Sequence, residues 1–533
     1  MSPLARFPRA SSAAAVVTAA LLAHWPALRA GYVLDDETLL AANPYVRTLS
    51  GLRVLVTSEF FVATAKPEYA AQYRPVSGAF NWVSWQLLGG SAPAQHALNI
   101  ALHAGVCVLL LAVLSACGVR RGIALAAAVL FAVHPATTMD VSYTEGRQDL
   151  LGWCFALGVA LAACPARAET ARWRSALALG GASFVGTLLA AHCREAFVGS
   201  FVGPALLAWG VRPRDPKRAA GVAGGGVAAF AVTMALRALV VKTPSDSPNW
   251  SLGGGIAAAV SAMVRLAKDV VLPTDLALQM TPAALGLAGA LLVASAFCAC
   301  AVASDRLLAA RAPAMRPLAW AAWAIAATQA AVYAIVVLKF TALSDRYAYG
   351  FVLAAAMLGA ACAESLPAPR PIVVRAVSAG LAALALAILP LTWARATDFR
   401  SEATLQAAMV EERPDDPETQ IAQGLGLLAR GDVEAAYPHC AAYAAARPSS
   451  DRPSLCIGLW ELSHGKWCPA SARLRPYALA RPGYPLSRSA ALEAAFQCND
   501  LAAVREMLSD WEPAFPDAPE IVAARRRLDE LAR

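Results

Sequence analysis

Runs of apolar residues dominate the chain as far as residue 394. Eleven of these runs approach the roughly 20 apolar residues that a helix needs to cross about 30 Å of hydrocarbon. They are residues 11–28, 97–117, 122–138, 150–166, 175–191, 196–211, 219–240, 282–303, 317–338, 347–363 and 376–394. Polar residues fall mainly between the runs. The pattern therefore predicts an all-α, polytopic membrane domain of about eleven transmembrane helices over residues 1–394.

Lys and Arg residues between the runs give the predicted helices an orientation. Short cytoplasmic loops of membrane proteins are enriched in Lys and Arg. If the N-terminus lies inside, the basic residues concentrate in alternate connections, of which the one at Arg120 and Arg121 is an example. Eleven crossings then place residues 395–533 outside, on the same side as the long polar connection at about residues 29–78.

Two segments bear on this count of crossings. The N-terminal residues resemble a secretory signal, but the long apolar run and the bulky residues after it favour a retained first helix. Residues 255–272 are apolar but carry Arg265 and Lys268 on one helical face. If this segment crossed the membrane, the Arg-rich loop 305–316 would move outside, so we expect an amphipathic helix in the outer interface.

Beyond residue 394 the apolar runs give way to a repeat. Gly431, Gly465 and Asn499 are spaced 34 residues apart. Arg-Pro pairs recur at the same spacing, at Arg413-Pro414, Arg447-Pro448 and Arg481-Pro482, followed by Pro516. This is the tetratricopeptide period, in which Gly or Asn takes the left-handed turn between paired helices and Pro ends the second helix. We therefore predict a C-terminal tetratricopeptide-repeat α-solenoid over residues 395–533, whose concave surface recruits a polypeptide partner.

The distribution of charge divides the chain at the same place. Residues 395–533 carry 20 Asp and Glu against 16 Lys and Arg, whereas the rest carries 17 against 29. The basic residues of the first part are interspersed with apolar runs and form no continuous patch, which argues against nucleic-acid binding. The net charge of +8 therefore reflects membrane topology.

Four of the twelve cysteines lie in the repeats: Cys440, Cys456, Cys468 and Cys498. They form no C-x-x-C motif, which disfavours a zinc site. In an oxidising compartment one or two disulfides can form among them. The sequence leaves their pairing open.

Charged residues gather in the connections that are predicted to lie outside. The first of these carries Asp35 and Asp36 and ends at Arg74. The later ones add His134, Asp140, Arg147, Glu195, Lys339, Arg346 and Tyr347. A carboxylate can deprotonate an acceptor hydroxyl, and arginines can hold the phosphate of a lipid leaving group. The combination favours transfer of a group from a membrane-anchored phosphate; solvated loops, headgroup anchors and simple ion pairs are the structural alternatives.

Three polar residues share one face of a predicted helix: His96, Asn99 and His103. They could bind a metal ion, but hydrogen bonds between helices are the preferred interpretation. No other compact ligand set indicates a metal site. We predict no metal site and no resident cofactor, and the sequence leaves the metal dependence of the reaction open.

The ordered set of motifs resembles a known family. It comprises Asp35-Asp36 after the first run, Tyr73-Arg74-Pro75, Gln95-His96-x-x-Asn99, His134-Pro135, Gly146-Arg147-x-Asp149, Arg194-Glu195 and Asp345-Arg346-Tyr347, followed by the repeats. In order and spacing it is similar to the transmembrane and tetratricopeptide-repeat protein O-mannosyltransferases and their bacterial relatives, which are polytopic glycosyltransferases of the GT-C superfamily. The resemblance spans nearly the whole chain.

The resemblance implies a polyprenyl-phosphate sugar donor, catalysis on the outer face and inversion at the anomeric carbon. Asp35 or Asp36 would be the base or would position the acceptor. Arg346 would lead in binding the lipid phosphate, supported by Arg74 and Arg147. In a bacterium this places the enzyme in the inner membrane, with the active site and repeats in the periplasm.

One motif departs from the family pattern. Relatives commonly have Thr-Glu where this chain has Thr138-Met139. Either Asp140 supplies the missing carboxylate or that acidic role is absent.

We therefore expect an inverting glycosyltransferase that moves a mannose-like sugar to a Ser or Thr hydroxyl of a protein, with the lipid-linked sugar as co-substrate. In this mechanism the hydroxyl enters near Asp36, Glu195 belongs to the catalytic group, and the phosphate lies against Arg346 with Lys339 and Tyr347 nearby. The alternatives are a GT-C enzyme that glycosylates a lipid or polysaccharide, and a non-catalytic membrane scaffold.

Overall fold

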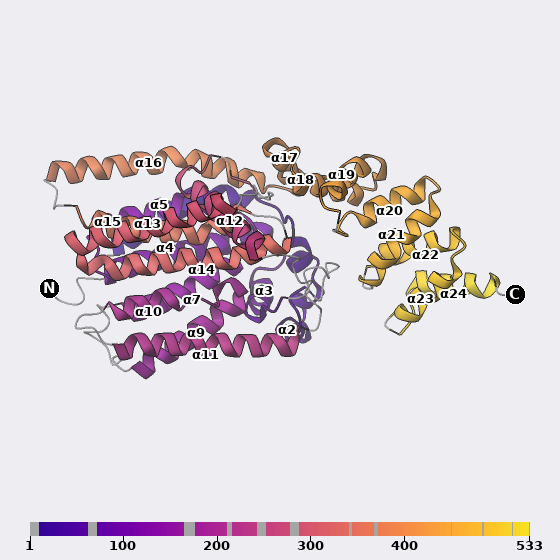
Figure 1. The fold of residues 1–533 in the computed structure, drawn as a ribbon, viewed down its shortest axis with the longest axis horizontal. Helices are drawn as coiled ribbons and strands as arrows, with labels where there is room; N and C mark the ends of the chain where they lie inside the picture. The colour runs from indigo at the N-terminus through magenta and orange to yellow at the C-terminus, as the bar shows by residue number, and fades with distance from the viewer. Residues whose placement is uncertain are drawn as a thin grey trace. The chain divides into compact units, whose positions relative to one another are not determined.

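The computed structural model (Figure 1) describes residues 10–61, 72–164, 176–210, 216–241, 252–274, 276–277, 287–340, 344–366, 371–448, 450–481, 484–513 and 515–531. Every regular element in these ranges is helical, which confirms the all-α prediction. The chain forms two compact units, one up to Ala408 and one from Met409 onward.

The first unit is a bundle of apolar helices that run roughly side by side (Figure 1). Eleven of its helices overlap the predicted runs: α1 (Ala10–His24), α4 (Ala92–Ala116), α5 (Arg121–Val133), α7 (Arg147–Ala163), α9 (Ala176–Cys193), α10 (Val202–Trp209), α11 (Pro216–Val240), α13 (Leu287–Arg311), α14 (Arg316–Phe340), α15 (Tyr349–Ala363) and α16 (Pro371–Asp398).

The chain is a multi-pass membrane protein, but its full-length spans are fewer than the apolar runs. Within the described ranges, seven helices are long and apolar enough to cross a membrane, or eight if α5 and its bent continuation form one span. The sequence predicts about eleven. Part of the difference lies in helix length, because α7 has only 17 residues and α10 only 8.

Contacts between connections place alternate loops at the same end of the bundle. Arg121 at the start of α5 donates to Ser11 and Ser12 at the start of α1, at 3.1 and 3.0 Å. Arg120 forms a 3.0 Å ion pair with Glu364, which follows α15. These are connections that the charge pattern groups on one side.

At the opposite end the connections fold into short helices, three of which contain the predicted site residues Asp140, Glu195, Arg346 and Tyr347. They are η2 (Trp25–Arg29), η3 (Glu37–Ala41), η4 (Pro44–Arg47), α2 (Leu49–Thr57), α3 (Pro75–Leu88), η6 (Pro135–Thr137), α6 (Thr138–Ser142), η7 (Thr144–Gly146), η9 (Glu195–Phe197) and η11 (Asp345–Ala348). The end of the bundle that carries Arg120 and Arg121 has a short helix of its own, η10 (Pro313–Met315). The predicted interfacial helix is α12 (Leu252–Val271), which is not among the helices long and apolar enough to span.

Glycines bring α9 and α11 into backbone contact. A Cβ at Gly225 would lie 2.0 Å from the Gly180 carbonyl oxygen, and one at Gly221 would lie 2.2 Å from that of Ala176. Gly221 and Gly225 are four residues apart, so they form a small-xxx-small contact of the kind that joins membrane helices. This contact fixes how far the C-terminal end of α11 extends relative to the segment that follows α9.

The second unit is a series of helices, each packed against the next. After α17 (Glu402–Glu412), which straddles the division between the units, come α18 (Pro417–Ala429), α19 (Val433–Ala446), α20 (Ser454–Ser463), α21 (Trp467–Leu479), α22 (Pro485–Gln497), α23 (Leu501–Trp511) and α24 (Pro519–Leu531). Gly431, Gly465 and Asn499 have φ of +81°, +67° and +60° between paired helices. The predicted left-handed turns at the 34-residue spacing are therefore confirmed.

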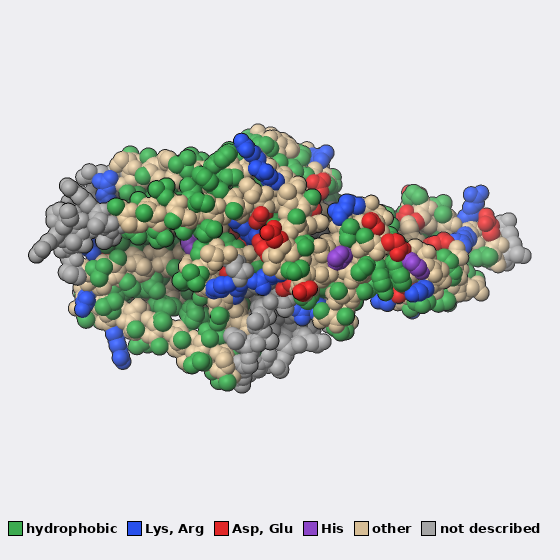
Figure 2. Space-filling view, turned by 90° about the horizontal axis from the view of Figure 1, so that it is seen from above, with side chains coloured by type: hydrophobic (Ala, Val, Ile, Leu, Met, Phe, Trp, Pro, Cys, Tyr) green, Lys and Arg blue, Asp and Glu red, His purple; other side chains and the backbone are tan. Residues whose placement is uncertain are grey.

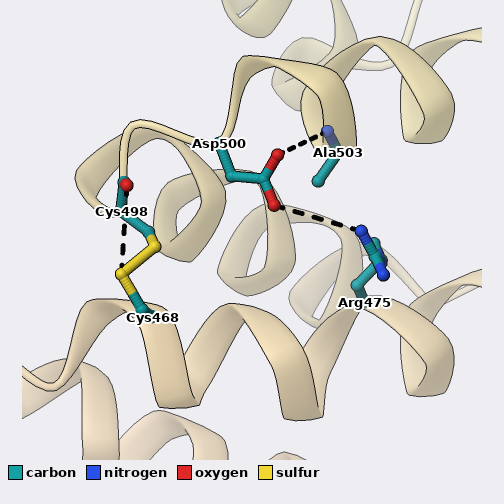
Figure 3. Close-up of a disulfide and its surroundings, with 5 residues drawn as sticks. All are labelled: Cys468, Arg475, Cys498, Asp500 and Ala503. Carbon is teal, nitrogen blue, oxygen red and sulfur yellow. Dashed lines mark hydrogen bonds and ion pairs between the residues drawn. A yellow bond between two sulfur atoms is a disulfide. The ribbon is translucent and has the colours of Figure 1, made fainter.

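Two disulfides join successive helices of the second unit. Cys440 in α19 bonds to Cys456 in α20, and Cys468 in α21 bonds to Cys498 at the end of α22 (Figure 3). Beside the second bond, Asp500 caps α23 by accepting the Ala503 N–H at 3.0 Å. The structure thus supplies the pairing that the sequence leaves open.

Candidate functional site

A single buried guanidinium supports the loop of residues 143–147. Arg147 is fully buried at the start of α7. Its Nε donates to the Thr144 carbonyl at 2.9 Å, and its Nη1 donates to Ser84 Oγ at 2.9 Å and Gln95 Oε1 at 3.0 Å. These partners connect the loop to α3 and α4. The structure therefore shows Arg147, which was predicted to contact the sugar donor, as a buried residue that supports the loop.

Asp36 holds the same loop through its carboxyl group. Its Oδ1 accepts the Glu145 N–H at 2.9 Å and its Oδ2 accepts the Thr144 N–H at 3.1 Å. Burial raises the pKa of Asp36 to about 8, and the neighbouring charge of Glu145 adds to the rise. Asp36 is 0% exposed, so its carboxyl is enclosed by the protein.

Asp35 is the more accessible carboxylate of the pair, since it is only partly buried. Burial raises the pKa of the Tyr143 phenol, and the charges of Asp35 and Asp36 add to that rise, so both carboxylates lie within electrostatic reach of the ring. The guanidinium of Arg346 lies 5.4 Å from the centre of the same ring. Tyr143 therefore neighbours both a candidate base and the leading candidate for the phosphate.

A chain of side-chain hydrogen bonds runs from the loop to Arg74. Glu145 accepts from Asn81 Nδ2 at 2.7 Å and from Gln148 Nε2. Gln148 then uses its Oε1 to accept Arg74 Nη1 at 2.7 Å. Because Glu145 accepts only, it fixes the orientation of the Gln148 amide and so presents the amide oxygen to Arg74. Burial raises the pKa of Glu145.

Glu195 is bound by three N–H donors. It accepts the backbone N–H of Tyr73 at 3.1 Å, Arg74 Nε at 2.8 Å and Arg237 Nη1 at 3.3 Å. We call Arg74, Glu195 and Arg237 the Glu195 cluster. With its oxygens engaged in this way, Glu195 anchors arginines and is poorly placed to act as a base.

A second carboxylate also holds two arginines. Asp149 accepts from Arg194 Nη1 and from Arg346 Nη2, the latter at 2.8 Å. Arg194 lies 5.2 Å from the ring centre of Tyr347, which was predicted beside the donor. We call Asp149, Arg194 and Arg346 the Asp149 cluster.

Two adjacent pairs of residues link the clusters. Gln148 contributes to the contacts of the Glu195 cluster, whereas its neighbour Asp149 is the centre of the other. Likewise, Arg194 belongs to the Asp149 cluster, whereas its neighbour Glu195 is the centre of the Glu195 cluster. Arg194 has an extended backbone (φ −158°, ψ 136°), in which successive side chains point to opposite sides. Figure 2 shows charged side chains gathered on part of an otherwise mainly uncharged face of the bundle.

Asp140 adds a further carboxyl group beside the Asp149 cluster. It is fully buried and interacts electrostatically with Asp149 and Arg346. Asp140 therefore lies close to the Asp149 cluster, and its assignment as the carboxylate that replaces Glu at Met139 stays a prediction.

The predicted histidine candidates make structural hydrogen bonds. His134 Nε2 lies 3.0 Å from the Val270 carbonyl, and its Nδ1 accepts the Ala136 N–H at 3.2 Å. His96 Nε2 lies 3.1 Å from the Gly31 carbonyl. The His96 contact agrees with the hydrogen-bonding interpretation of the polar helix face.

Part of the site lies beyond the sequence predictions. The side chain of Lys339 is outside the described residues. Asn81, Gln148 and Arg237 are connected to predicted residues but were not themselves predicted. Gln148 could have been found from its place between Arg147 and Asp149, whereas Arg237 resembles an ordinary headgroup anchor in the sequence.

In the part of the chain that the structure describes, no group of three His, Cys, Asp or Glu side chains is arranged to hold a metal ion.

Comparison with curated proteins finds relatives that share one kind of name. The chain is 29% identical to mouse protein O-mannosyl-transferase TMTC3 over 147 residues, which are 27% of this chain and 16% of the relative. It is 32% identical to human TMTC1 over 148 residues, 27% of this chain and 16% of the relative. It is 32% identical to human TMTC4 over 154 residues, 26% of this chain and 21% of the relative.

The matched segment spans about a sixth to a fifth of the length of these relatives. No family model matches the chain. No solved structure matches it either. Over 26–27% of its length, this chain is a distant relative of the TMTC protein O-mannosyl-transferases.

Proposed function

We propose that this chain is an integral-membrane glycosyltransferase that moves a mannose-like sugar from a polyprenyl-phosphate donor to a Ser or Thr hydroxyl of a protein. The names of its relatives support the reaction class. The multi-pass bundle supports a lipid-borne donor, because such a donor must be reached at the membrane surface. The carboxylates and arginines at one end of the bundle supply the chemistry.

The shared neighbour of Asp35 and Arg346 carries the proposal. Asp35 interacts electrostatically with Tyr143 and Arg346 lies 5.4 Å from its ring centre, so a partly exposed carboxylate and a guanidinium share one neighbour. Transfer from a sugar phosphate needs this pair, because the acceptor hydroxyl must lose a proton while the leaving phosphate gains negative charge.

In the proposed reaction Asp35 takes the proton of the acceptor hydroxyl as its oxygen attacks the anomeric carbon. The new O–C1 bond forms while the bond from C1 to the phosphate oxygen breaks, and its electron pair leaves with the phosphate. Arg346 stabilises that charge. Attack opposite the leaving group inverts the anomeric centre. A positioned base is typically worth about 10²–10⁴-fold in rate.

We assign the base to Asp35 and a positioning role to Asp36. Asp36 is fully buried and accepts hydrogen bonds from the N–H groups of Thr144 and Glu145. These bonds fix the backbone directly after Tyr143. Glu195 likewise positions Arg74.

The proposed location is a bacterial inner membrane, with the site and the repeat unit on the periplasmic side. The basic alternate loops support this orientation. Disulfides Cys440–Cys456 and Cys468–Cys498 fit an oxidising compartment. A helical repeat array offers a surface for an extended acceptor polypeptide, and we propose this as its role.

The test uses purified full-length protein, a polyprenyl-phosphate sugar labelled in the sugar, and Ser/Thr-containing polypeptide acceptors. Label should move to the polypeptide, and Asp35→Asn should lower the rate by at least about 100-fold. Asp305→Asn is a matched control, because Asp305 pairs with Arg316 at the other end of the bundle. Label that appears on lipid or polysaccharide and not on polypeptide would contradict the assigned acceptor.

A further inference from the structure

The Glu195 cluster is more open to solvent than the Asp149 cluster. The side chains of Arg74, Glu195 and Arg237 are 14%, 26% and 30% exposed. Asp149 is 3% exposed. The two guanidinium groups and the partly exposed carboxylate of this cluster together carry one net positive charge. This charge suits the binding of an anion.

The two arginines differ in how firmly they are held. Arg74 contacts Glu195 at 2.8 Å and Gln148 at 2.7 Å, and its side chain is the more buried. Arg237 reaches Glu195 at the longer distance of 3.3 Å. Its backbone is nevertheless fixed, because α11 packs against α9 through Gly225. Arg74 therefore has two short contacts, whereas Arg237 is the more exposed and lies farther from Glu195, which suits exchange of Glu195 for another anion without movement of its helix.

Arg237 also lies at a suitable depth for a lipid phosphate. It is in the last turn of α11, which is one of the helices able to span a membrane. The end of a spanning helix lies near the headgroup region, where lipid phosphates are located. An anion that reaches this cluster can therefore remain attached to a membrane lipid.

The reaction changes the charge of that phosphate. The donor is a phosphodiester with one negative charge, whereas the lipid left after sugar transfer is a monoester with a charge of about −1.5 to −2 at pH 7. Two guanidinium groups match a monoester dianion better than a diester. We propose that the Glu195 cluster binds the polyprenyl monophosphate product, with Arg74 and Arg237 on the phosphate and Glu195 as the counter-ion that it displaces. This inference rests on the proposed function.

The test measures the Kd of a short-chain polyprenyl monophosphate for the purified full chain in detergent. Arg237→Gln should weaken binding about tenfold, the effect of losing one charge-assisted hydrogen bond, and Arg237→Lys should fall in between. Glu195→Gln keeps an acceptor for Arg74 but removes the negative charge that competes with the phosphate for the two arginines. This variant should therefore bind the monophosphate about threefold more tightly, or more. Arg316→Gln, at the other end of the bundle, is the control.

The sign of the Glu195→Gln effect separates the proposal from a purely structural role. Weaker binding in that variant, or Arg237→Gln binding as tightly as Arg316→Gln, overturns the inference. Equal affinity for phosphatidylglycerol, a diester, overturns it in favour of a headgroup anchor, and so does absence of monophosphate binding by the unmodified chain. Melting temperatures without lipid identify unfolded variants. The labelled-sugar assay tests the proposed function separately, because it measures transfer and not the affinity for the monophosphate.

Discussion

Replacement of Arg147 separates support of the loop from binding of the donor. Its guanidinium makes three hydrogen bonds of 2.9–3.0 Å, to Thr144, Ser84 and Gln95, inside a fully buried site. Each buried acceptor left without a donor costs about 1–3 kcal/mol. Arg147→Met should therefore cost about 3–9 kcal/mol, and Arg147→Lys, which retains the charge and some of the contacts, about 1–3 kcal/mol.

The assay compares thermal unfolding and transfer kinetics of Arg147→Lys and Arg346→Lys in detergent. Arg147→Lys should melt at a lower temperature and lose active protein, while the KM for the lipid-linked donor in the surviving fraction stays within about twofold of the original. Arg346→Lys should keep the melting temperature and raise that KM about tenfold, because the bidentate contact with phosphate is lost. An unchanged melting temperature together with a raised donor KM in Arg147→Lys would refute the reasoning.

Three further predictions follow from the same structure. Asp36→Asn should flatten the pH dependence of stability, measured by melting between pH 5 and 8. Because the pKa of buried Asp36 is raised to about 8, the folded state holds the proton more tightly than the unfolded state, and the original chain loses up to about 1.4 kcal/mol of stability per pH unit as the pH rises. Parallel stability curves for the two proteins would contradict this. Gly225→Leu should abolish stable folding, seen as loss of a monodisperse species in detergent, because even a Cβ there would lie 2.0 Å from a carbonyl oxygen of α9; a normal melting curve would be inconsistent with that contact. Replacement of Cys468 and Cys498 by Ser should destabilise the second unit by about 2–4 kcal/mol, measured as its resistance to proteolysis within the full chain; unchanged resistance would argue against the bond.

The fold was largely predictable because its determinants are local. Apolar runs predict membrane helices, and a 34-residue spacing of Gly431, Gly465 and Asn499 predicts left-handed turns that the structure contains. The number of full-length spans was less predictable, since α7 and α10 are too short to span alone and the sequence pattern does not show where a helix ends.

The site was predictable as a set of residues, and much less so as a set of roles. Arg147 and Arg346 look alike in the sequence, yet the first donates its hydrogen bonds to neutral groups and the second lies at Asp149 beside Tyr143. The role of Arg237 depends on the close packing of α9 and α11, which brings together residues 42 positions apart. Burial and partner choice arise from tertiary packing, which single-sequence patterns do not encode.

The most direct measurement of the central claim is single-turnover transfer of labelled sugar from a polyprenyl-phosphate donor by the purified full-length chain. The account predicts loss of label from the lipid at the rate at which it appears on a Ser or Thr of the polypeptide, with that rate reduced by at least about 100-fold in Asp35→Asn. Consumption of the donor at an unchanged rate by Asp35→Asn, or no transfer by the folded original chain, would contradict it.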